Sequence, residues 1–472
     1  MSVNPTGASF ATASFETVRD ALDRHVTAWN AMHRDACEAT HVHGEQSSEV
    51  LDLRMTCLQD RLTEIRALTD VLTDANREVV TRAPEAVQGL GSLQRCADVA
   101  ALRAVVRPPE DPAIRRAVDD VRTRLAEVKA LTDAGRMKRA LAIAPALLDD
   151  ARKTHYLPVI AEASRRLGEV HLEAGDGVAA ERADEEAVWA AEASRDDEIA
   201  LEAAVQLIVN VGYYQARVRD AERWASFADA LLQRLGPGHE ILQSWRYNNL
   251  AIVYVGEGRP REALAMFEKA VALKEKVLGP RHIDVAISVG NVAMVLHDLG
   301  RFDESTAANQ RALDIYRRTV GLQHPRAAQV LVNQAERLNE RGLYVEARAY
   351  AQQALDVMER EFAPGHPDVA AALMAVGLAE LGLDDTAHAV PRLEHALSIS
   401  QATGGKPVHL GDVQFALARA LWQARGHAER ALHLATEARE GLAHLENGRA
   451  RLAEVDAWLA QHRLGLQPIS LR

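Results

Sequence analysis

A 42-residue period in the second half of the sequence constrains the fold more than any other feature. Histidine stands at 282, 324 and 366, each time in a short segment with proline or glycine nearby. Periods of about 20–50 residues indicate repeat architectures such as solenoids or propellers. A fixed repeat carries these histidines along the stack and keeps them apart, so they cannot form one shared site. We therefore interpret His282, His324 and His366 as architectural residues in the connections between units.

Small residues mark further fixed points of the same period. Positions 42 residues apart hold Gly258, Gly300, Gly342, Asp384 and Gly426. Alanine follows each of these positions twelve residues later, without exception. Glycine permits a tight reversal of the chain, and small side chains let two helices approach closely. Each unit is thus predicted to be a helical hairpin, and looser copies extend the pattern upstream to Gly135, Gly175 and Ala216.

The composition agrees with a purely helical fold. Only 4% of the 472 residues are aromatic, which favours helix-on-helix packing over sheets. The predicted fold class is all-α, with an N-terminal helical hairpin domain over residues 1–107 that turns near Gly44. A right-handed solenoid of about eight helical hairpins follows over 113–445, and a capping helix and tail over 446–472. The sequence RPPEDP, from 107 to 112, separates the first two parts because a residue before proline is pushed out of helical conformation.

Charge and hydropathy exclude several classes of partner. The net charge of -12 argues against binding a nucleic acid or an anionic membrane over the whole surface. No run of about 18 apolar residues is present, so membrane insertion is not expected. The first residues lack the basic start and apolar core of a secretory signal. As written, the chain is predicted to be cytoplasmic.

The sequence contains no recognisable catalytic or cofactor-binding motif. The tripeptide HRD at 33–35 is shared with the catalytic loop of kinases, but Thr40 stands where that loop needs asparagine. The tripeptide also lies inside an amphipathic helical pattern, so we attribute it to chance. Neither a P-loop, GxSxG, HExxH nor a convincing Cys/His cluster is present. We expect no enzyme activity, no cofactor and no metal.

One unit carries a family signature at seven positions. These are Leu250, Ala251, Tyr254, Gly258, Ala263, Phe267 and Ala270. In this pattern the unit resembles a tetratricopeptide repeat. The extra length falls in the connection with the sequence GxxHPDVA, and in this the units resemble the repeats of kinesin light chains. The resemblance implies a solenoid whose first helices line a concave groove for a protein or peptide ligand.

In this family register, asparagine occupies one groove position in three successive units, at Asn249, Asn291 and Asn333. An amide offers both donors and an acceptor, so a row of asparagines can hold the main chain of an extended peptide. The alternative is that these side chains bond neighbouring backbone or each other. Ile252 and Met294 would add an apolar strip to the same wall, which Glu336 interrupts. Trp245 is either an aromatic anchor in the groove or a packing residue between repeats.

The three cysteines all lie in the N-terminal part, at 37, 57 and 96. Cys37 and Cys57 fall at similar heights on the two predicted helices and could face each other. Buried thiols are the default in a reducing cytosol, and a Cys37–Cys57 disulfide is the alternative.

The order of motifs over nearly the whole chain resembles the region that follows the catalytic domain in myxobacterial-type serine/threonine kinases. The resemblance implies a sensor or docking module, which could lie outside the cytoplasm, where the Cys37–Cys57 bridge would be more favoured. Two functions remain open. One is a non-catalytic scaffold that binds a protein segment in its groove and self-associates through the N-terminal hairpin. The other is the regulatory region of a bacterial kinase, present as a fragment or a detached relative.

Overall fold

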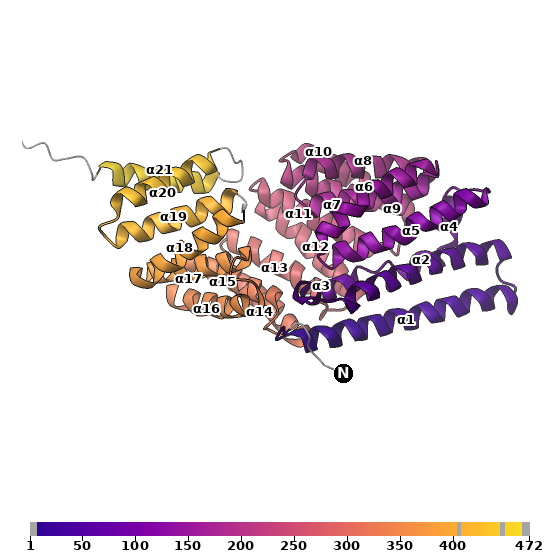
Figure 1. Ribbon diagram of the computed structural model, residues 1–472, viewed down its shortest axis with the longest axis horizontal. Helices are drawn as coiled ribbons and strands as arrows, with labels where there is room; N and C mark the ends of the chain where they lie inside the picture. Colours follow the sequence, from indigo (N-terminus) through magenta and orange to yellow (C-terminus); the bar gives the residue numbers. More distant parts are fainter. Residues whose placement is uncertain (1–6, 404–406, 444–448, 465–472) are drawn as a thin grey trace, which may run out of the picture. The chain divides into compact units, whose positions relative to one another are not determined.

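The computed structural model describes residues 7–403, 407–443 and 449–464, and all regular structure in these ranges is helical (Figure 1). Consecutive helical hairpins follow one another along the chain. The predicted fold class, an all-α solenoid of helical hairpins, is confirmed.

The N-terminal part begins with a long helical hairpin. Its helices are α1 (Ala11–His41) and α2 (Ser48–Thr73), followed by α3 (Arg77–Gln88), the 3-10 helix η1 (Leu93–Ala97) and α4 (Val99–Ala104). The chain reverses at Gly44, whose φ of +64° suits glycine, and Ser47 caps α2 by accepting a hydrogen bond from Val50 N. The indole Nε1 of Trp29 donates to Leu58 O at 2.8 Å, which ties α1 to α2.

Helices continue through the rest of the described chain. The first seven of these helices are α5 (Pro112–Asp133), α6 (Met137–Lys153), α7 (Leu157–Glu173), α8 (Gly177–Ser194), α9 (Asp197–Val209), α10 (Val218–Leu235) and α11 (Glu240–Gly256). Helix α9 runs into the π-helical turn η2 (Asn210–Tyr214). The next six are α12 (Pro260–Leu278), α13 (Ile283–Asp298), α14 (Phe302–Thr319), α15 (Pro325–Glu340), α16 (Tyr344–Glu361) and α17 (Pro367–Gly382). The last are α18 (Thr386–Ala402), α19 (Pro407–Gln423), α20 (Ala428–Leu442) and α21 (Arg449–Leu464).

The turns between paired helices share one backbone conformation. All eight residues that the sequence places at these turns have φ between +55° and +85°: Gly135, Gly175, Ala216, Gly258, Gly300, Gly342, Asp384 and Gly426. Six of the eight are glycine, the residue that adopts positive φ at no steric cost. Ala216 and Asp384 keep the same conformation without glycine, so the geometry of the hairpin decides the turn at these two positions.

The periodic histidines cap helices. His282 Nδ1 accepts from Asp284 N at 3.2 Å at the start of α13, and His366 Nδ1 accepts from Asp368 N at 3.2 Å at the start of α17. His324 does the same for α15, with a distance of 3.1 Å to Arg326 N. Burial lowers the pKa of His282, which favours the neutral ring that can accept this bond. The architectural interpretation of the three histidines is confirmed.

The chain divides into two compact units. The first comprises residues 1–301 with 318–320, and the second comprises 302–317 with 321–472. The division falls inside the repeats, and the N-terminal hairpin belongs to the same unit as the first hairpins of the solenoid. No helix in the described parts of the chain has the length and apolar character that a bilayer crossing requires.

Candidate functional site

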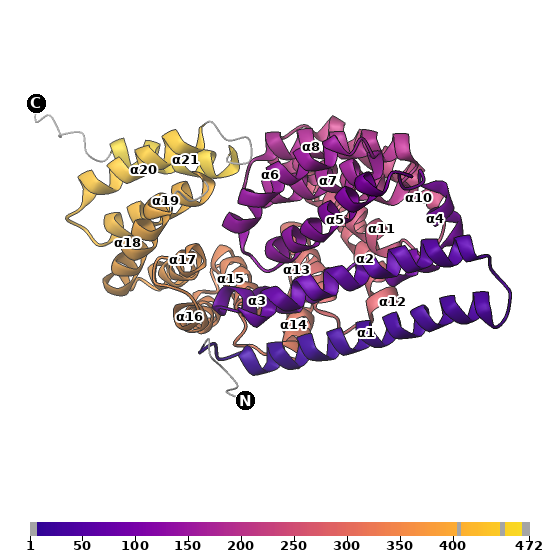
Figure 2. The same ribbon diagram turned by 45° about the vertical axis from the view of Figure 1, so that its right-hand side comes forward.

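A cavity of about 1620 Å³ opens inside the first unit. Helix α2 packs beside α5 (Figures 1 and 2), and residues of α2, of the segment 89–110, and of α5, α7 and α9 line the cavity, together with Trp245 of α11. The repeats therefore contribute the first helix of each of four successive hairpins. This is the side of the hairpins on which the sequence predicts a binding groove.

Charged side chains recur on the cavity face of each of these helices. Their spacing of three, four or seven residues returns each one to the same side of a helix. The cavity faces carry Arg122, Lys129 and Asp133 on α5, Glu162, Arg165, Arg166 and Glu169 on α7, and Glu198 and Glu202 on α9. Sequence reasoning missed this set, although the charged stripes at helical spacing could have indicated it.

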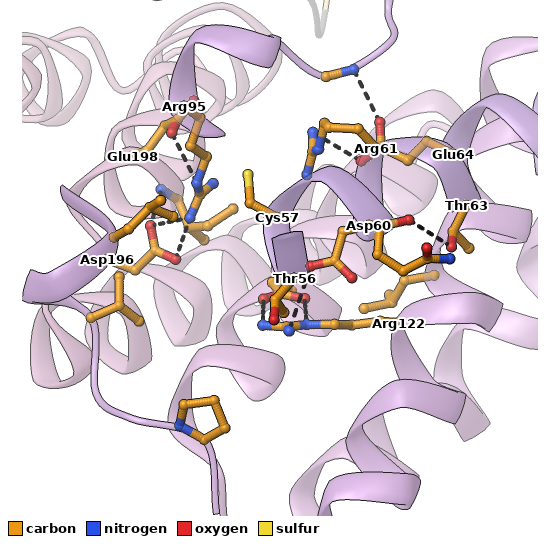
Figure 3. A pocket seen from close by; sticks show the side chains of 18 of the residues that line it. Thr56, Cys57, Asp60, Arg61, Thr63, Glu64, Arg95, Arg122, Asp196 and Glu198 are labelled. Atoms are coloured by element: carbon orange, nitrogen blue, oxygen red, sulfur yellow. Dashed lines mark hydrogen bonds and ion pairs between the residues drawn. The ribbon is translucent and has the colours of Figure 1, made fainter. Parts of the chain in front are cut away.

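Arg122 joins three elements of the cavity wall (Figure 3). Its guanidinium donates to Glu162 of α7 through Nη2 at 2.8 Å and Nε at 3.1 Å. Its Nη1 lies 3.5 Å from Asp60 Oδ2 of α2. Burial raises the pKa of Asp60 to about 6, although Arg122 acts in the opposite direction. Helix α2 is thus held to the repeats through a carboxyl group that titrates near neutral pH.

Arg95 fixes the opposite wall (Figure 3). Its Nη2 donates to both carboxylate oxygens of Asp196, at 2.9 and 2.7 Å, and its Nε lies 3.2 Å from Glu198 Oε2. Asp196 also caps α9 by accepting a hydrogen bond from Ile199 N. The η1 segment is therefore anchored to the start of a repeat helix.

The disulfide of this region differs from the expected one. Cys57 of α2 is bonded to Cys96 of η1, and Cys37 has a free thiol. The default of two free thiols at Cys37 and Cys57 and the alternative Cys37–Cys57 bridge are therefore both wrong. The prediction compared heights along α1 and α2 alone, whereas the chain after α3 returns and places Cys96 beside α2.

A further group of charges lies where α2 meets α5. Glu64 Oε2 accepts from Gly91 N at 3.0 Å, and Lys129 Nζ donates to Asp133 Oδ2 at 2.6 Å. Burial acts to raise the pKa of Glu64, but Arg61 and Lys129 outweigh it and hold this pKa below its ordinary value. Burial raises the pKa of Asp133 despite the neighbouring lysine. Arg61 pairs with Glu64 within α2 and Lys129 pairs with Asp133 within α5, so each helix supplies partners for its own buried charges.

The predicted asparagine row makes contacts within the protein. Asn249 Nδ2 donates to Val205 O of the preceding repeat at 2.9 Å. Asn291 Nδ2 donates to Asn248 Oδ1 at 3.2 Å, and Asn248 Nδ2 donates to Asn249 Oδ1 at 3.2 Å. Asn333 lies in the second unit, is exposed, and accepts from Gln329 Nε2 at 3.0 Å. Such bonds are expected if the asparagine side chains bond neighbouring backbone or other side chains of the protein. Peptide binding by this asparagine row stays a prediction.

The other predicted groove residues have different surroundings. Trp245 lines the cavity and remains 41% exposed, so its ring is available to a ligand. Ile252 and Met294 are half-buried and do not line this cavity. In the described part of the chain, no three His, Cys, Asp or Glu side chains come together as a metal site would require.

Comparisons with known proteins identify the repeats. A tetratricopeptide repeat model matches residues 240–318, 284–344 and 326–402. A search of curated proteins finds no match.

Among solved structures, a signal transduction ATPase with a tetratricopeptide repeat sensor from Pyrococcus horikoshii is 14% identical, with a TM-score of 0.51. The match covers 85% of this chain and 55% of that one. A putative kinesin light chain repeat protein from Podosopora anserina is 23% identical, with a TM-score of 0.36, over 44% of this chain and 98% of that one. The likeness to the Pyrococcus structure shows the fold, and the family model shows that residues 240–402 of this chain are tetratricopeptide repeats.

Proposed function

We propose that the chain is a non-catalytic protein-interaction scaffold that binds a protein or peptide segment on the surface formed by the first helices of its hairpins. The observation that carries this proposal is the cavity of about 1620 Å³, to which α5, α7, α9 and α11 all contribute. Small-molecule pockets are commonly about 300–1,000 Å³. A cavity above this range fits a peptide segment better than a small metabolite.

The lining offers the two kinds of contact that a peptide site uses. Trp245 supplies a partly exposed aromatic ring at one side, and aromatic residues often dominate the energy of such interfaces. The charged faces of α5, α7 and α9 supply fixed hydrogen-bond donors and acceptors. Because most of these charges are already paired with each other, they hold their positions before a ligand arrives, which reduces the entropic cost of binding.

Affinity capture from native lysate with four forms of the protein tests the proposal. The forms are the wild type, Trp245→Ala, the triple variant with alanine at Asn249, Asn291 and Asn333, and Trp189→Ala. Trp189 is 59% exposed on α8 and does not line the cavity, so it is the matched control for Trp245.

We expect a partner that wild type and Trp189→Ala retain and that Trp245→Ala loses. The triple variant decides whether the asparagine row also contributes. A partner recovered equally by wild type and Trp245→Ala would show that the cavity is not the binding surface, and recovery of no partner by any form would contradict the scaffold itself.

The finer proposal places the scaffold in bacterial signalling, as the sensor or regulatory region of a serine/threonine kinase. It is supported by the motif order, which resembles the region after the catalytic domain in such kinases. The coding sequence directly upstream tests it, because an in-frame kinase domain would support the proposal and an unrelated gene would contradict it.

The N-terminal hairpin is the proposed surface for self-association. Sedimentation equilibrium of the wild type over a range of concentrations tests this proposal. A single monomeric mass throughout would contradict it.

A further inference from the structure

The segment between α3 and α5 forms part of the cavity wall. We call residues 89–107 the strap; it contains η1 and α4, and residues from both of its ends and from its middle line the cavity. Within the strap only Leu93 and Cys96 are buried, and α4 buries no residue. A segment with so little buried apolar surface has a low local stability of its own. The strap therefore depends on a few points of attachment.

The two ends of the strap are attached by hydrogen bonds. At its start, Gly91 N donates to Glu64 Oε2 of α2 at 3.0 Å. At its end, Val106 N donates to Ser194 O of α8 at 3.0 Å, and Val106 O accepts from Tyr156 Oη at 2.9 Å. Val106 itself is 46% exposed. Because single hydrogen bonds contribute modestly to stability and water competes for them, these ends open readily when the middle is not held.

The middle of the strap is held by the disulfide. Cys96 of η1 is bonded to Cys57 of α2, and both residues belong to a small apolar cluster with Leu58 and Leu93. Both buried residues of the strap are thus members of this one cluster. Arg95, the residue before Cys96, pairs with the start of α9. The bridge therefore fixes η1 on α2 and keeps Arg95 in place for its ion pair.

Only one of the two bonded cysteines faces the cavity. Cys57 lines the cavity, whereas Cys96 is fully enclosed. Figure 3 shows Cys57 between Arg61 and Arg95 at the cavity wall. Cations stabilise the thiolate that leaves when a disulfide is attacked, which speeds exchange. A cavity of about 1620 Å³ admits a small thiol, while a folded protein reductant is too large to enter it.

We propose that the Cys57–Cys96 disulfide is a redox switch that a low-molecular-weight thiol operates from the cavity, and that its reduction releases the strap. Release of the strap removes part of the cavity wall and opens the first helices of the hairpins to a larger ligand. In the oxidised state the strap restricts access to this surface. The inference rests on the proposed function where ligand access is concerned, whereas the switch itself is tested without a ligand.

The exchange consumes two small thiols. The thiolate of the first attacks Cys57 Sγ and forms a mixed disulfide, while the bond to Cys96 breaks and Cys96 leaves as a thiolate that takes up a proton. The thiolate of the second attacks the small thiol's sulfur in the mixed disulfide, and Cys57 leaves as a thiolate that takes up a proton. The two small thiols are thereby oxidised to their disulfide, and the protein disulfide is reduced by two electrons.

Hydrogen exchange of the full chain, followed by mass spectrometry, tests the release of the strap. The oxidised protein is compared with protein treated with excess reduced glutathione, and alkylation reads the state of Cys57 and Cys96. We expect glutathione to reduce the bridge under native conditions and amides of the strap then to exchange at least about tenfold faster. Amides of α12, which does not line the cavity, are the control and should exchange as before.

Two results of this experiment would overturn the switch. One is a bridge that resists glutathione in the folded protein, and the other is a reduced protein whose strap exchanges as slowly as the oxidised one. A thioredoxin-type dithiol protein forms a second arm. Because it cannot enter the cavity, it should reduce the bridge more slowly than glutathione does, and an equal or faster rate would overturn access through the cavity.

Hydroxyl-radical footprinting gives a second readout at the end of the strap. Tyr156 is only 6% exposed, and its hydroxyl donates to Val106 O, so its oxidation should increase when the bridge is reduced. Tyr316 is also buried and lies outside the strap and the cavity lining, which makes it the control. Unchanged oxidation of Tyr156 in the reduced protein would overturn release of the whole strap.

Variants tie the effect to the bridge. Strap amides of Cys96→Ser should exchange fast with and without glutathione, whereas Cys37→Ser keeps the bridge and should respond as the wild type does. If Cys96→Ser fails to fold, reduction and reoxidation of Cys37→Ser decide in its place, because the response should reverse. A wild-type response to glutathione in Cys96→Ser, or an irreversible one in Cys37→Ser, would overturn the role of the bridge.

Affinity capture with oxidised and reduced protein separates the switch from the scaffold. We expect the reduced wild type to retain more of the partner that Trp245→Ala loses. Equal retention by the two forms would overturn control of binding by the strap and leave the scaffold proposal standing. Release of the strap without any captured partner would contradict the scaffold and leave the redox switch itself standing.

Discussion

Arg95 and Asp196 stand 101 positions apart in the sequence, yet Arg95 Nη2 lies 2.9 and 2.7 Å from the two carboxylate oxygens of Asp196. This pair ties the N-terminal part to the start of α9. Because Asp196 also caps α9, one contact holds the cavity wall and orders the first turn of a repeat helix.

Loss of this pair is expected to destabilise the first unit. Arg95→Met leaves the carboxylate of Asp196, which is only 4% exposed, without its cation, so the free energy of unfolding should fall by about 2–3 kcal/mol. Urea unfolding followed by circular dichroism measures the change. Arg152→Met breaks an exposed pair and should cost less than about 1 kcal/mol. Equal effects of the two substitutions would contradict the anchoring role of Arg95.

The disulfide predicts a definite thiol count. Under denaturing, non-reducing conditions one thiol should react, that of Cys37, and three should react after reduction. Cys96→Ser should lower the free energy of unfolding by about 2–4 kcal/mol, because the bridge closes a loop of 39 residues. Cys37→Ser should change it by less than about 0.5 kcal/mol. Three reactive thiols in the oxidised protein would show that the bridge does not form.

Two helical glycines predict opposite outcomes of the same substitution. A Cβ at Gly168 of α7 would lie 2.6 Å from Asp184 Cγ of α8, so Gly168→Ala should destabilise the protein by about 1–3 kcal/mol through overpacking. A Cβ at Gly290 of α13 would meet no atom within 4 Å. Gly290→Ala should therefore stabilise the protein by about 1 kcal/mol through helix propensity. Thermal unfolding compares the two, and stabilisation by both would contradict the close approach of α7 and α8.

The turn at Ala216 offers a site for stabilisation. Ala216 has a φ of +55°, which costs a residue with a Cβ about 1–2 kcal/mol relative to the ordinary regions. Ala216→Gly should raise the free energy of unfolding by about 1 kcal/mol. Gly258→Ala is the reciprocal control, since Gly258 has a φ of +71° with no atom near its Cβ position, and it should destabilise by a similar amount. Urea unfolding distinguishes these results, and a loss of stability in Ala216→Gly would contradict the strained turn.

Asp184 predicts a pH dependence of stability. Burial raises its pKa from an ordinary value of 3.8 to about 7, so between these pH values the folded state binds more protons than the unfolded state. The contribution of Asp184 to stability therefore falls as pH rises from about 4 to about 7, by an amount of the order of 4 kcal/mol, and is constant above that range.

Asp184→Asn should remove this slope. Unfolding measured at several pH values gives the difference between variant and wild type, which isolates the contribution of residue 184 from that of the other carboxylates. Asp149→Asn, at an exposed position, should follow the wild-type curve. A parallel curve for Asp184→Asn would contradict the perturbed titration.

The candidate site was only partly predictable from the sequence. Family register placed Trp245 on the first-helix side of the hairpins, and Trp245 does line the cavity, because side-chain direction along a helix follows from local periodicity. The pairing of Arg122 with Glu162 and Asp60 could not be found in this way, since the partners lie on three helices whose packing is not encoded in any one segment. Asn249 illustrates the same limit, because its amide bonds Val205 O of another repeat, 44 positions away.

The repeating unit of this protein follows directly from its sequence. A 42-residue period, small residues at fixed points and a turn residue in each unit specify helical hairpins because helices, caps and tight turns depend on residues only a few positions apart. The period located the turn at Asp384, and its looser upstream copies located the turn at Ala216. Tertiary structure decided the Cys57–Cys96 pairing, the ion pairs that bind the N-terminal hairpin to the repeats and the cavity between them. Those features depend on how whole helices pack, and packing is fixed by the summed contacts of residues distant in the sequence.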